Sequence, residues 1–234
     1  MKIYEAVIKV HAAVSVGFVD GWHESVEELP GPQAIDFHYH DVEEWLTVVS
    51  GEITFFTLAD KPIPVDIGRS LHIPRGEVHR VEVGSRGVEY RIFLPITEPL
   101  YANELSEGEL ETLRHNLKFP EYEDGRAENG RDFFEDILSD RLVFCRANGK
   151  IVGKRTFIDG AFGNDVVRNQ RRSSSGSIQV LSKKKRGLLI STVVEMPEAG
   201  SLNSYMNVRF LAEEGGKLRC RLWVNYPQLT SAWH

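Results

Sequence analysis

The chain has 234 residues, of which 41% are hydrophobic and 26% are charged, and its formal net charge at pH 7 is −6. This is the composition of an ordinary globular protein; it disfavours nucleic-acid binding, and no run approaches the roughly 20 apolar residues of a membrane helix. The length suits two domains of roughly 100 residues each better than one compact domain.

The N-terminus, MKIYEAVIKV, continues directly into an amphipathic strand pattern. It lacks the long apolar core and the small-residue cleavage site of a signal peptide. Cys145 and Cys220 lie far apart without CxxC spacing, which suggests neither a disulfide framework nor a cysteine zinc site. We therefore expect a cytoplasmic protein that has no membrane partner.

The first 97 residues read as short strands separated by turns. The strand-forming runs are rich in β-branched or aromatic residues and are bounded by Gly, Pro and Asp; they cover residues 6–10, 47–58, 70–74, 80–84 and 88–96. The stretch at 24–32 is predicted to be irregular. Many short strands at close spacing favour a barrel or a sandwich.

Two histidines and three carboxylates stand in the first eight residues of FHYHDVEEWLTVVSG, at 37–51, a run otherwise rich in strand formers. Side chains alternate along a strand, so His38, His40 and Glu44 are expected on one face. The stretch GRSLHIPRGEVHR, at 68–80, adds a turn followed by His79. Three imidazoles and one carboxylate suit Fe, Mn, Ni, Co, Cu or Zn, but spacing alone does not bring His79 to the other three.

These stretches resemble the two motifs of the cupin superfamily. The first motif, HxH followed by Glu and then by Gly, is matched by His38, His40, Glu44 and Gly51. The second, GxxxxxPxGxxH, is matched by Gly68, Pro74, Gly76 and His79. Two positions depart from the family pattern, because Pro32 and Val83 replace an expected Gly and Asn.

The resemblance covers roughly residues 20–97. It implies a cupin β-barrel, or jelly roll, that holds one divalent transition metal ion on His38, His40, Glu44 and His79. The competing interpretation is a degenerate cupin in which these four side chains only hydrogen-bond to one another and to water.

Other residues near the motifs have simpler interpretations. Glu43 has the opposite parity to Glu44 and is expected to face outward, and His72 is expected to be an ordinary strand histidine. Arg91 fits either an anionic substrate or a surface acid, and His11 and His23 are expected to have no role. Four aromatic residues fit a pocket wall and a packed core equally well: Tyr39, Trp45, Phe55 and Phe56.

The pattern changes after Pro99, and we place the domain boundary near residues 98–104, which gives domains 1–99 and 100–234. The first predicted element is a helix that begins with a Ser106–Glu109 capping box and ends near Phe119. A polar loop at 121–130 and a helix at 131–138 follow, and then a hairpin at 141–153 that turns at Asn148-Gly149. The last predicted elements are a helix at 154–162 and strands at 177–182, 187–196 and 205–226. Helices followed by a meander of strands are an α+β order.

Charge also differs between the two halves. Residues 1–100 carry a net charge of −8 and the remainder +2. The basic clusters at 171–172 and 183–186 flank turn-like stretches, so we expect them at solvated hairpin tips and not on a nucleic acid.

Residues 104–227 resemble the NTF2-like superfamily, which includes the SnoaL-type cyclases. The resemblance rests on the element order and on the phrases DRLVFCRANGKIVGKRTFIDG and YMNVRFLAEEGGKLRCRLWVNYP. It implies an α+β cone, a curved sheet wrapped by helices, and a homodimer is expected.

The cone has no shared catalytic motif, so alternation along its closing strands gives candidates only. Two polar stripes result, namely Tyr205, Asn207 and Arg209, and then Arg219, Arg221, Trp223 and Asn225. We expect such stripes on an exposed or dimer-facing surface more often than in a catalytic lining. Acid or base roles for Asp159, His115 or Tyr122 stay open, and the sequence selects no catalytic residue.

Three functions compete at this level. The leading one is a metal-dependent enzyme, an oxygenase or an isomerase or lyase, that acts on a small organic molecule at the cupin site, while the NTF2-like domain shapes a pocket or a dimer. The second is a non-catalytic cupin that binds or senses a small ligand. The third is an NTF2-type cyclase or dehydratase whose site lies in the C-terminal half.

Overall fold

The computed structural model describes residues 9–12, 22–95, 100–163, 172–198 and 201–227. The chain divides into two compact units, Ala6–Leu110 and Glu111–His234, and each is described by itself. The division falls within helix α1 (Glu107–Leu117). The domain ranges 1–99 and 100–234 stay a prediction.

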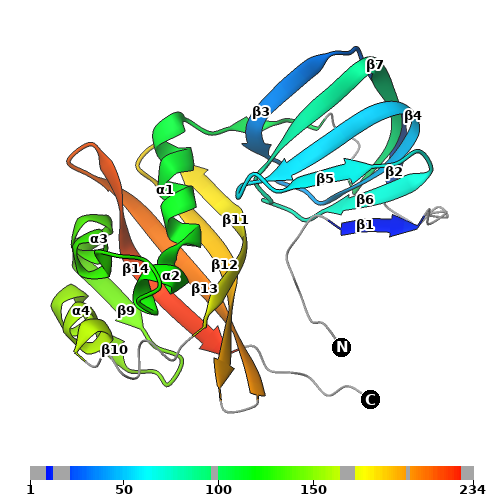
Figure 1. Ribbon diagram of the computed structural model, residues 1–234. Coiled ribbons are helices and arrows are strands. Elements are labelled where there is room, and N and C mark those ends of the chain that lie inside the picture. The colour runs from blue at the N-terminus through cyan, green and yellow to red at the C-terminus, as the bar shows by residue number, and fades with distance from the viewer. Residues whose placement is uncertain (1–8, 13–21, 96–99, 164–171, 199–200, 228–234) are drawn as a thin grey trace. The chain divides into compact units, whose positions relative to one another are not determined.

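The N-terminal unit is built from antiparallel strands that Figure 1 shows wrapped around a common interior. Their bounds are β1 (Lys9–Ala12), β2 (His23–Leu29), β3 (Gln33–Tyr39), β4 (Glu44–Thr57), β5 (Pro62–Val65), β6 (Arg69–Ile73), β7 (His79–Leu94) and β8 (Asn103–Glu104). Within the described residues they form one sheet in the order β1-β6-β4-β7-β3-β8, with β2 paired to β7 and β5 to β4. The predicted barrel class is confirmed.

Two sequence predictions for this unit are wrong in detail. The stretch 24–32, predicted to be irregular, contains most of β2, a strand whose first six side chains are all exposed. β2 is an edge strand that pairs only with β7 among the described strands, and these side chains are exposed even where they line the barrel cavity, so it carries no apolar alternation that could have predicted a strand. The two strands predicted at 80–84 and 88–96 are one strand, β7, which continues through Gly84 and Gly87.

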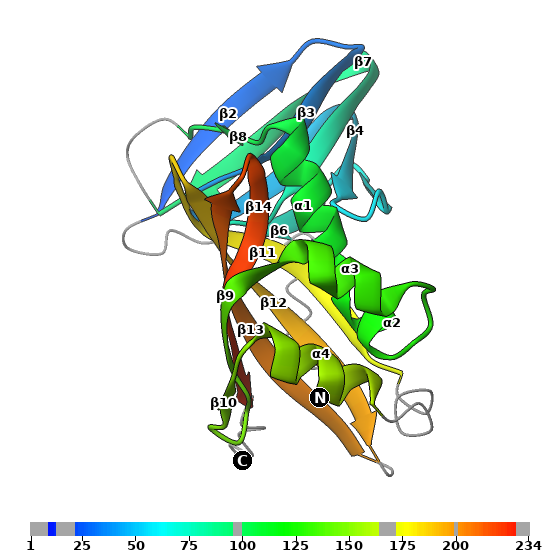
Figure 2. The ribbon, with the colours of Figure 1, turned by 90° about the vertical axis from the view of Figure 1, so that its left-hand side faces the viewer.

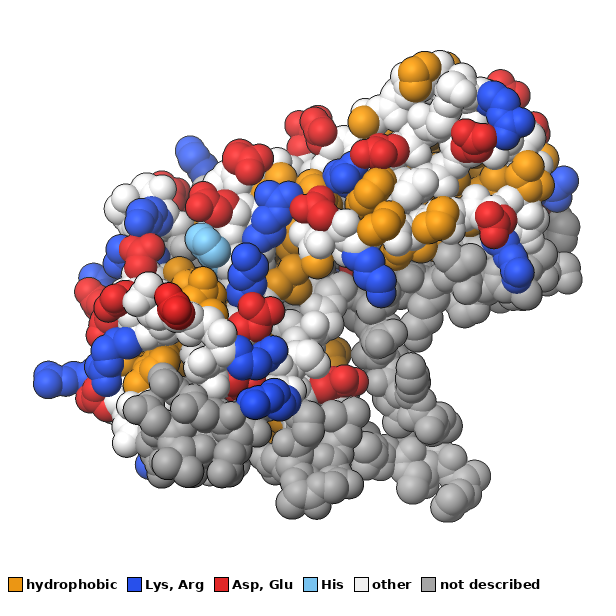
Figure 3. Space-filling model, in the orientation of Figure 1, with side chains coloured by type: hydrophobic (Ala, Val, Ile, Leu, Met, Phe, Trp, Pro, Cys, Tyr) orange, Lys and Arg blue, Asp and Glu red, His pale blue; other side chains and the backbone are white. Residues whose placement is uncertain are grey.

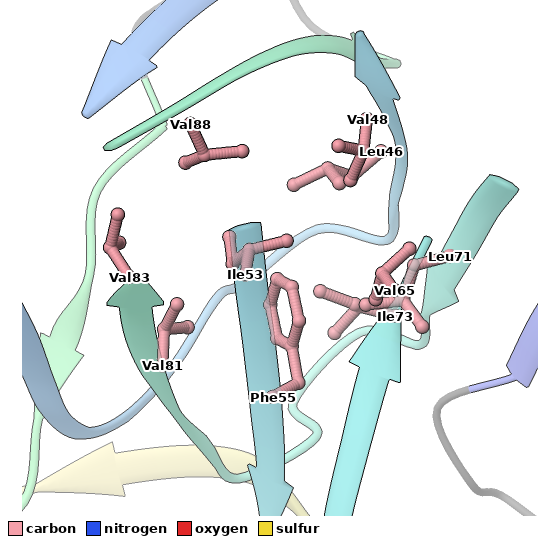
Figure 4. Packing of buried hydrophobic residues seen from close by; sticks show 10 residues of the cluster. All are labelled: Leu46, Val48, Ile53, Phe55, Val65, Leu71, Ile73, Val81, Val83 and Val88. Carbon is pink, nitrogen blue, oxygen red and sulfur yellow. The ribbon is translucent and has the colours of Figure 1, made fainter. Parts of the chain in front are cut away.

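Aliphatic side chains and the ring of Phe55 pack together in the barrel interior. Figure 4 shows these residues converging from β4 to β7: Leu46, Val48, Ile53, Phe55, Val65, Leu71, Ile73, Val81, Val83 and Val88. Each is at most 4% exposed. Their burial stabilises the barrel by roughly 1.5–3 kcal/mol for each large side chain.

The C-terminal unit packs helices on one face of a curved sheet, as Figures 1 and 2 show. Its remaining elements are α2 (Phe119–Glu123), α3 (Gly130–Ile137), β9 (Leu138–Cys145), β10 (Ile151–Val152), α4 (Lys154–Phe162), β11 (Ser174–Lys184), β12 (Gly187–Glu198), β13 (Ser201–Glu214) and β14 (Lys217–Pro227). The described strands follow the order β10-β9-β14-β13-β12-β11, and β14 runs parallel to β9. The predicted order of helices and strands is confirmed.

Local signals placed most elements of this unit correctly. Ser106 and Glu109 form the predicted capping box, because the backbone N–H of Ser106 donates to the Glu109 carboxylate at 2.7 Å and the N–H of Glu109 donates to Ser106 Oγ at 3.3 Å. The hairpin turn at Gly149 has φ of +80°, which glycine adopts readily. The predicted loop at 121–130 is partly wrong, because its first residues belong to α2, which has a proline in its first turn.

The polar stripe on β13 does not lie on an exposed surface. Asn207 and Arg209 are 2% and 1% exposed, so the expectation of a solvent-facing or dimer-facing stripe is wrong for both. On β14, Cys220 and Trp223 are both buried although their parity differs. A register shift next to Cys220 adds one residue to the strand, and strict alternation fails across it.

The side chain of Phe134 holds the helices of the C-terminal unit on the sheet. It is fully buried, and its ring contacts Phe119 and Phe157 at centroid distances of 5.2 and 5.3 Å. We expect Phe134→Ala to lower the free energy of unfolding by about 3–5 kcal/mol, because truncation leaves a cavity. Ile151→Ala, at a side chain that is 66% exposed, is the matched control and should change stability by less than about 0.5 kcal/mol in urea titrations. Equal effects of the two substitutions would contradict this account.

The surface carries charges of both signs. On the face shown in Figure 3, acidic and basic side chains of the described residues are interspersed. The cluster at 183–186 lies at the β11–β12 turn, as predicted, since Lys184 pairs with Gly187 across the hairpin. Residue 171 of the other cluster lies outside the described residues. No helix in the described part of the chain is long and apolar enough to cross a membrane.

Candidate metal centre

Three histidines meet in the barrel interior. His38 lies near the end of β3 and pairs in register with His79, the first residue of β7, while His40 follows β3 in the loop that leads to β4. Their side-chain ligand atoms all lie within 4.8 Å of one another, and all three residues are buried. Glu44 opens β4, and its Oε1 lies 4.0 Å from His40 Nε2.

The three histidines meet, with Glu44 next to His40, for a reason that differs from the predicted one. His38, His40 and Glu44 do not share one strand face, because β3 ends at Tyr39 and a short loop precedes Glu44. The loop is held by the second motif, since the backbone N–H of Gly76 donates to the carbonyl of His40 at 2.8 Å. The turn of one motif therefore fixes the histidine of the other.

Backbone carbonyls set the tautomer of each imidazole. Nδ1 lies 2.7 Å from the Asp36 carbonyl in His38, 3.0 Å from the Tyr101 carbonyl in His40, and 2.9 Å from the Glu77 carbonyl in His79. A carbonyl oxygen can only accept, so each Nδ1 carries the hydrogen and each Nε2 keeps its lone pair. Such a carbonyl partner is what orients a histidine that ligates a metal.

Burial sets the charge of the site. It lowers the pKa of His38, lowers that of His40 to about 4, and lowers that of His79 well below its usual range, and the neighbouring imidazoles add to the effect in His40 and His79. Burial likewise raises the pKa of Glu44 to about 8. The site therefore offers neutral imidazoles and a carboxyl group that needs a nearby cation to ionise at pH 7.

The donor set fits a transition metal ion. Two ligand atoms that each lie about 2.1 Å from one ion are at most about 4.2 Å apart. The spread of 4.8 Å within the histidine triad thus needs a contraction of about half an ångström, and the 4.0 Å between His40 and Glu44 already fits. Three nitrogen donors and one carboxylate suit Fe, Mn, Co, Ni or Zn.

The candidate ligands lie in a cavity of about 720 Å³ inside the barrel. Its wall is largely aliphatic and includes Leu29, Ile35, Leu46, Ile53, Val81, Ile92 and Leu94, together with the ring of Phe55. This volume is within the range of small-molecule sites.

Sequence reasoning missed five polar residues of this cavity: Tyr90, Glu27, Ser25, Glu24 and His23. Tyr90 could have been found, because it alternates with Ile92 and Leu94 on β7 and all three line the cavity. Glu27 and His23 lie on β2, which was not predicted as a strand, and His23 was expected to have no role. Burial, aided by the Glu27 and Glu44 carboxylates, raises the pKa of Tyr90 to about 12.

Glu43 and His72 lie as predicted, and the structure decides between the alternatives for Arg91, Phe55 and Phe56. Glu43 faces away from the cavity and lies 3.3 Å from His72 Nε2, and the His72 ring stacks on Trp45 at 4.5 Å. Arg91 lies 3.5 Å from Glu24 in an exposed ion pair, which supports the surface interpretation. Of the four aromatic candidates, Phe55 lines the cavity, while Phe56 lies outside it under the guanidinium of Arg80. The side chain of His11 lies outside the described residues.

The family comparison agrees with this geometry. Residues 25–93 match the family model described as the cupin domain. These residues are a cupin domain. The order of elements in the C-terminal unit is the one that the NTF2-like resemblance implies. No curated protein matches the chain.

Solved structures that are similar to the chain include proteins of both kinds. An NTF2-like protein of unknown function from Pseudomonas aeruginosa is 12% identical, with a TM-score of 0.43, and covers 50% of this chain and 94% of its own. A protein with a cupin-2 domain from Shewanella frigidimarina is 18% identical, with a TM-score of 0.29, and covers 37% of this chain and 78% of its own. The DMSP lyase DddQ from Ruegeria pomeroyi is 18% identical, with a TM-score of 0.32, and covers 40% of this chain and 50% of its own.

Proposed function

We propose that the cupin domain is the active centre of a metal-dependent enzyme that acts on a small, largely apolar organic molecule. His38, His40, His79 and Glu44 would hold one divalent transition metal ion. Such an ion, when bound, supplies Lewis acidity or redox chemistry, so oxygenase and isomerase or lyase reactions are both compatible with this donor set.

The observation that carries the proposal is the presence of acid–base groups in the same cavity as the candidate ligands. A cavity built only to capture a ligand needs no such groups, but this one is lined by Tyr90, Glu27 and His23. A phenol with a pKa of about 12 stays protonated at neutral pH. Tyr90 Oη can therefore donate a hydrogen bond or a proton to a substrate oxygen.

The remaining wall selects the substrate. Aliphatic side chains surround the ligands, and apart from the three histidines the charged and titratable groups that line the described cavity are Glu24, Glu27, Glu44, Tyr90 and His23. Neither Lys nor Arg is in that lining, so a strongly anionic substrate would have only the metal to bind. We expect a neutral molecule whose oxygen atom reaches the metal side of the cavity and whose body contacts Leu46, Ile53 and Phe55.

The deciding experiment combines elemental analysis with a turnover screen. Untagged protein is purified without added metal, its metal content is measured, and small phenols, enols and hydroxy-ketones are followed by mass spectrometry and by oxygen uptake. We expect close to one equivalent of metal and turnover that disappears in His79→Ala. Saturable binding without turnover would favour the ligand-binding alternative, and turnover that survives His79→Ala would place the chemistry in the C-terminal half.

Tyr90→Phe tests the proposed proton donor. The substitution removes only the hydroxyl, so metal content and thermal stability should stay close to those of the wild type. Turnover should fall by about 10²-fold or more, because loss of a positioned acid removes an effect of that size. The fall should appear in kcat more than in KM. Unchanged kcat would exclude Tyr90 as the donor.

A further inference from the structure

The C-terminal unit contains a second cavity, of about 400 Å³, that the proposed function does not use. Aromatic rings form much of its wall. The lining includes Phe119, Phe144, Phe157, Tyr205 and Trp223, together with Asn207, Arg209, Asn225 and Arg146. None of the three acid–base candidates considered from the sequence, Asp159, His115 and Tyr122, belongs to this lining.

Arg209 is a buried cation whose hydrogen-bond acceptors among the described residues are all uncharged, while the Glu123 carboxylate acts on it through space. Its side chain is 1% exposed, and its guanidinium lies over the rings of Phe119 and Trp223 at 4.1 and 4.8 Å. Nη1 donates to the backbone carbonyl and the side-chain oxygen of Asn116 at 2.9 and 3.1 Å, and Nη2 donates to Asn207 Oδ1 at 3.1 Å. These are neutral acceptors, so the hydrogen bonds of the guanidinium come from dipoles, and Glu123 is the one carboxylate in the described lining that can balance part of its charge.

The guanidinium also has unused donors. An arginine has five N–H groups, and three of them are used by Asn116 and Asn207. Nε has no hydrogen-bond partner in the described part of the chain. Burial lowers the pKa of Arg209 to about 10, so the group remains charged at neutral pH.

Other unpaired polar atoms gather at the same cavity. Among the described residues seven buried side-chain atoms lack a hydrogen-bond partner, and three of them, Arg209 Nε, Arg146 Nε and Asn225 Oδ1, belong to residues that line it. Buried polar groups are normally paired, so a concentration of unpaired ones marks a place where a partner is missing. The missing partner must accept from the two arginines and donate to Asn225.

Charge agrees with this assignment. The charged side chains in the described lining are Arg146, Arg209 and Glu123, which leaves one positive charge in excess. A ligand with one negative charge would neutralise the cavity, whereas a cationic ligand would add to the excess.

We propose that this cavity binds a small aromatic carboxylate that also carries a hydroxyl group. Its carboxylate would accept hydrogen bonds from Arg209 and Arg146, and its hydroxyl would donate to Asn225 Oδ1. Its ring would pack beside Trp223, whose centroid lies 4.5 Å from that of Phe144 and 5.2 Å from that of Phe157. A cavity of about 400 Å³ is large enough for one such ring.

The test uses 4-hydroxybenzoate as the probe and 4-hydroxybenzamide as its neutral counterpart, titrated calorimetrically into the full-length protein. We expect one equivalent of 4-hydroxybenzoate to bind, and 4-hydroxybenzamide to bind about 10- to 100-fold more weakly, because the amide loses charge-assisted hydrogen bonds. Equal affinities would overturn the proposal. Titration of His79→Ala is the control for binding at the cupin site, and it should leave the affinity unchanged.

Two substitutions localise the ligand. Arg209→Met removes the cation at similar volume and should weaken binding of 4-hydroxybenzoate by at least about 10-fold. Ala161→Leu adds bulk to the cavity from α4 while Arg209 stays in place, so it keeps the test valid if Arg209→Met does not fold. Leucine suits a helix, and the variant should lose binding while it keeps the thermal stability of the wild type. Full binding by Ala161→Leu, or loss of binding in His79→Ala, would contradict this site.

Discussion

Replacing His79 by alanine is expected to release the metal ion from the purified protein. His79 is 1% exposed, and its ligand nitrogen lies within 4.8 Å of those of both other histidines. Removal of a group that merely orients a ligand lowers metal affinity by about 10–100-fold, so removal of a ligand itself should lower it by more than about 100-fold. Equilibrium dialysis against cobalt, followed by elemental analysis, measures the change directly. His38→Ala should behave in the same way.

His72→Ala is the matched control for this prediction. It also removes an imidazole from the same unit, but His72 lies outside the cavity beside Glu43 and Trp45. Its metal content should equal that of the wild type. Stoichiometric metal in both His38→Ala and His79→Ala would exclude the proposed centre, and equal losses in His72→Ala would show that any disturbance of the barrel releases the ion.

Glu44→Gln tests whether the negative charge of Glu44, and not only its volume, contributes to metal affinity. The amide keeps the volume of the side chain but cannot supply a negative charge, and Glu44 is 3% exposed. If the carboxylate binds the ion, affinity should fall while the apo protein becomes no less stable, because a buried carboxyl group is costly to ionise. Unchanged affinity would leave the three histidines as the whole donor set.

The cupin domain could be predicted from the sequence because its motif residues occur at characteristic separations along the chain. Two motifs in the right order predicted His38, His40, Glu44 and His79 as one set, and the structure brings the three histidines together with Glu44 next to His40. The actual cause is a loop after β3, held by the hydrogen bond from Gly76 to the His40 carbonyl. Hydrogen bonds between distant segments leave no trace in local periodicity, so strand parity could not have predicted how the three histidines come together.

The C-terminal half shows where such reasoning stops. Helices and hairpins followed from caps, turn glycines and apolar spacing, which are local. The burial of Arg209 and Asn207 did not follow, because alternation assigns residues to a face but does not say which face the helices cover. A register shift near Cys220 then reversed the parity of β14 partway along its length. The site that we infer from Arg209 therefore depends on tertiary packing that no single-sequence pattern encodes.

Gly51→Ala is expected to disrupt the cupin barrel, and Gly68→Ala is expected to be tolerated. Both glycines have left-handed backbone conformations, with φ of +84° and +74°. An alanine in that region costs about 1–2 kcal/mol, a penalty that both variants share. The two positions differ in the room that they leave for a side chain. A Cβ at Gly51 would lie 2.0 Å from the Gly87 carbonyl oxygen, whereas a Cβ at Gly68 would meet nothing within 4 Å.

The clash at Gly51 falls where β4 pairs with β7, because Gly51 lies opposite Val88. Neither strand can move aside without breaking ladder hydrogen bonds that also position Tyr90 and His79 along β7. We therefore expect Gly51→Ala to lose more than about 4 kcal/mol, a large part of the 5–15 kcal/mol typical of a domain, and to retain little metal. Gly68→Ala should keep its metal and lose only the shared penalty in calorimetric unfolding. Equal losses would mean that backbone conformation, and not the close approach of β4 to β7, explains the glycine at position 51.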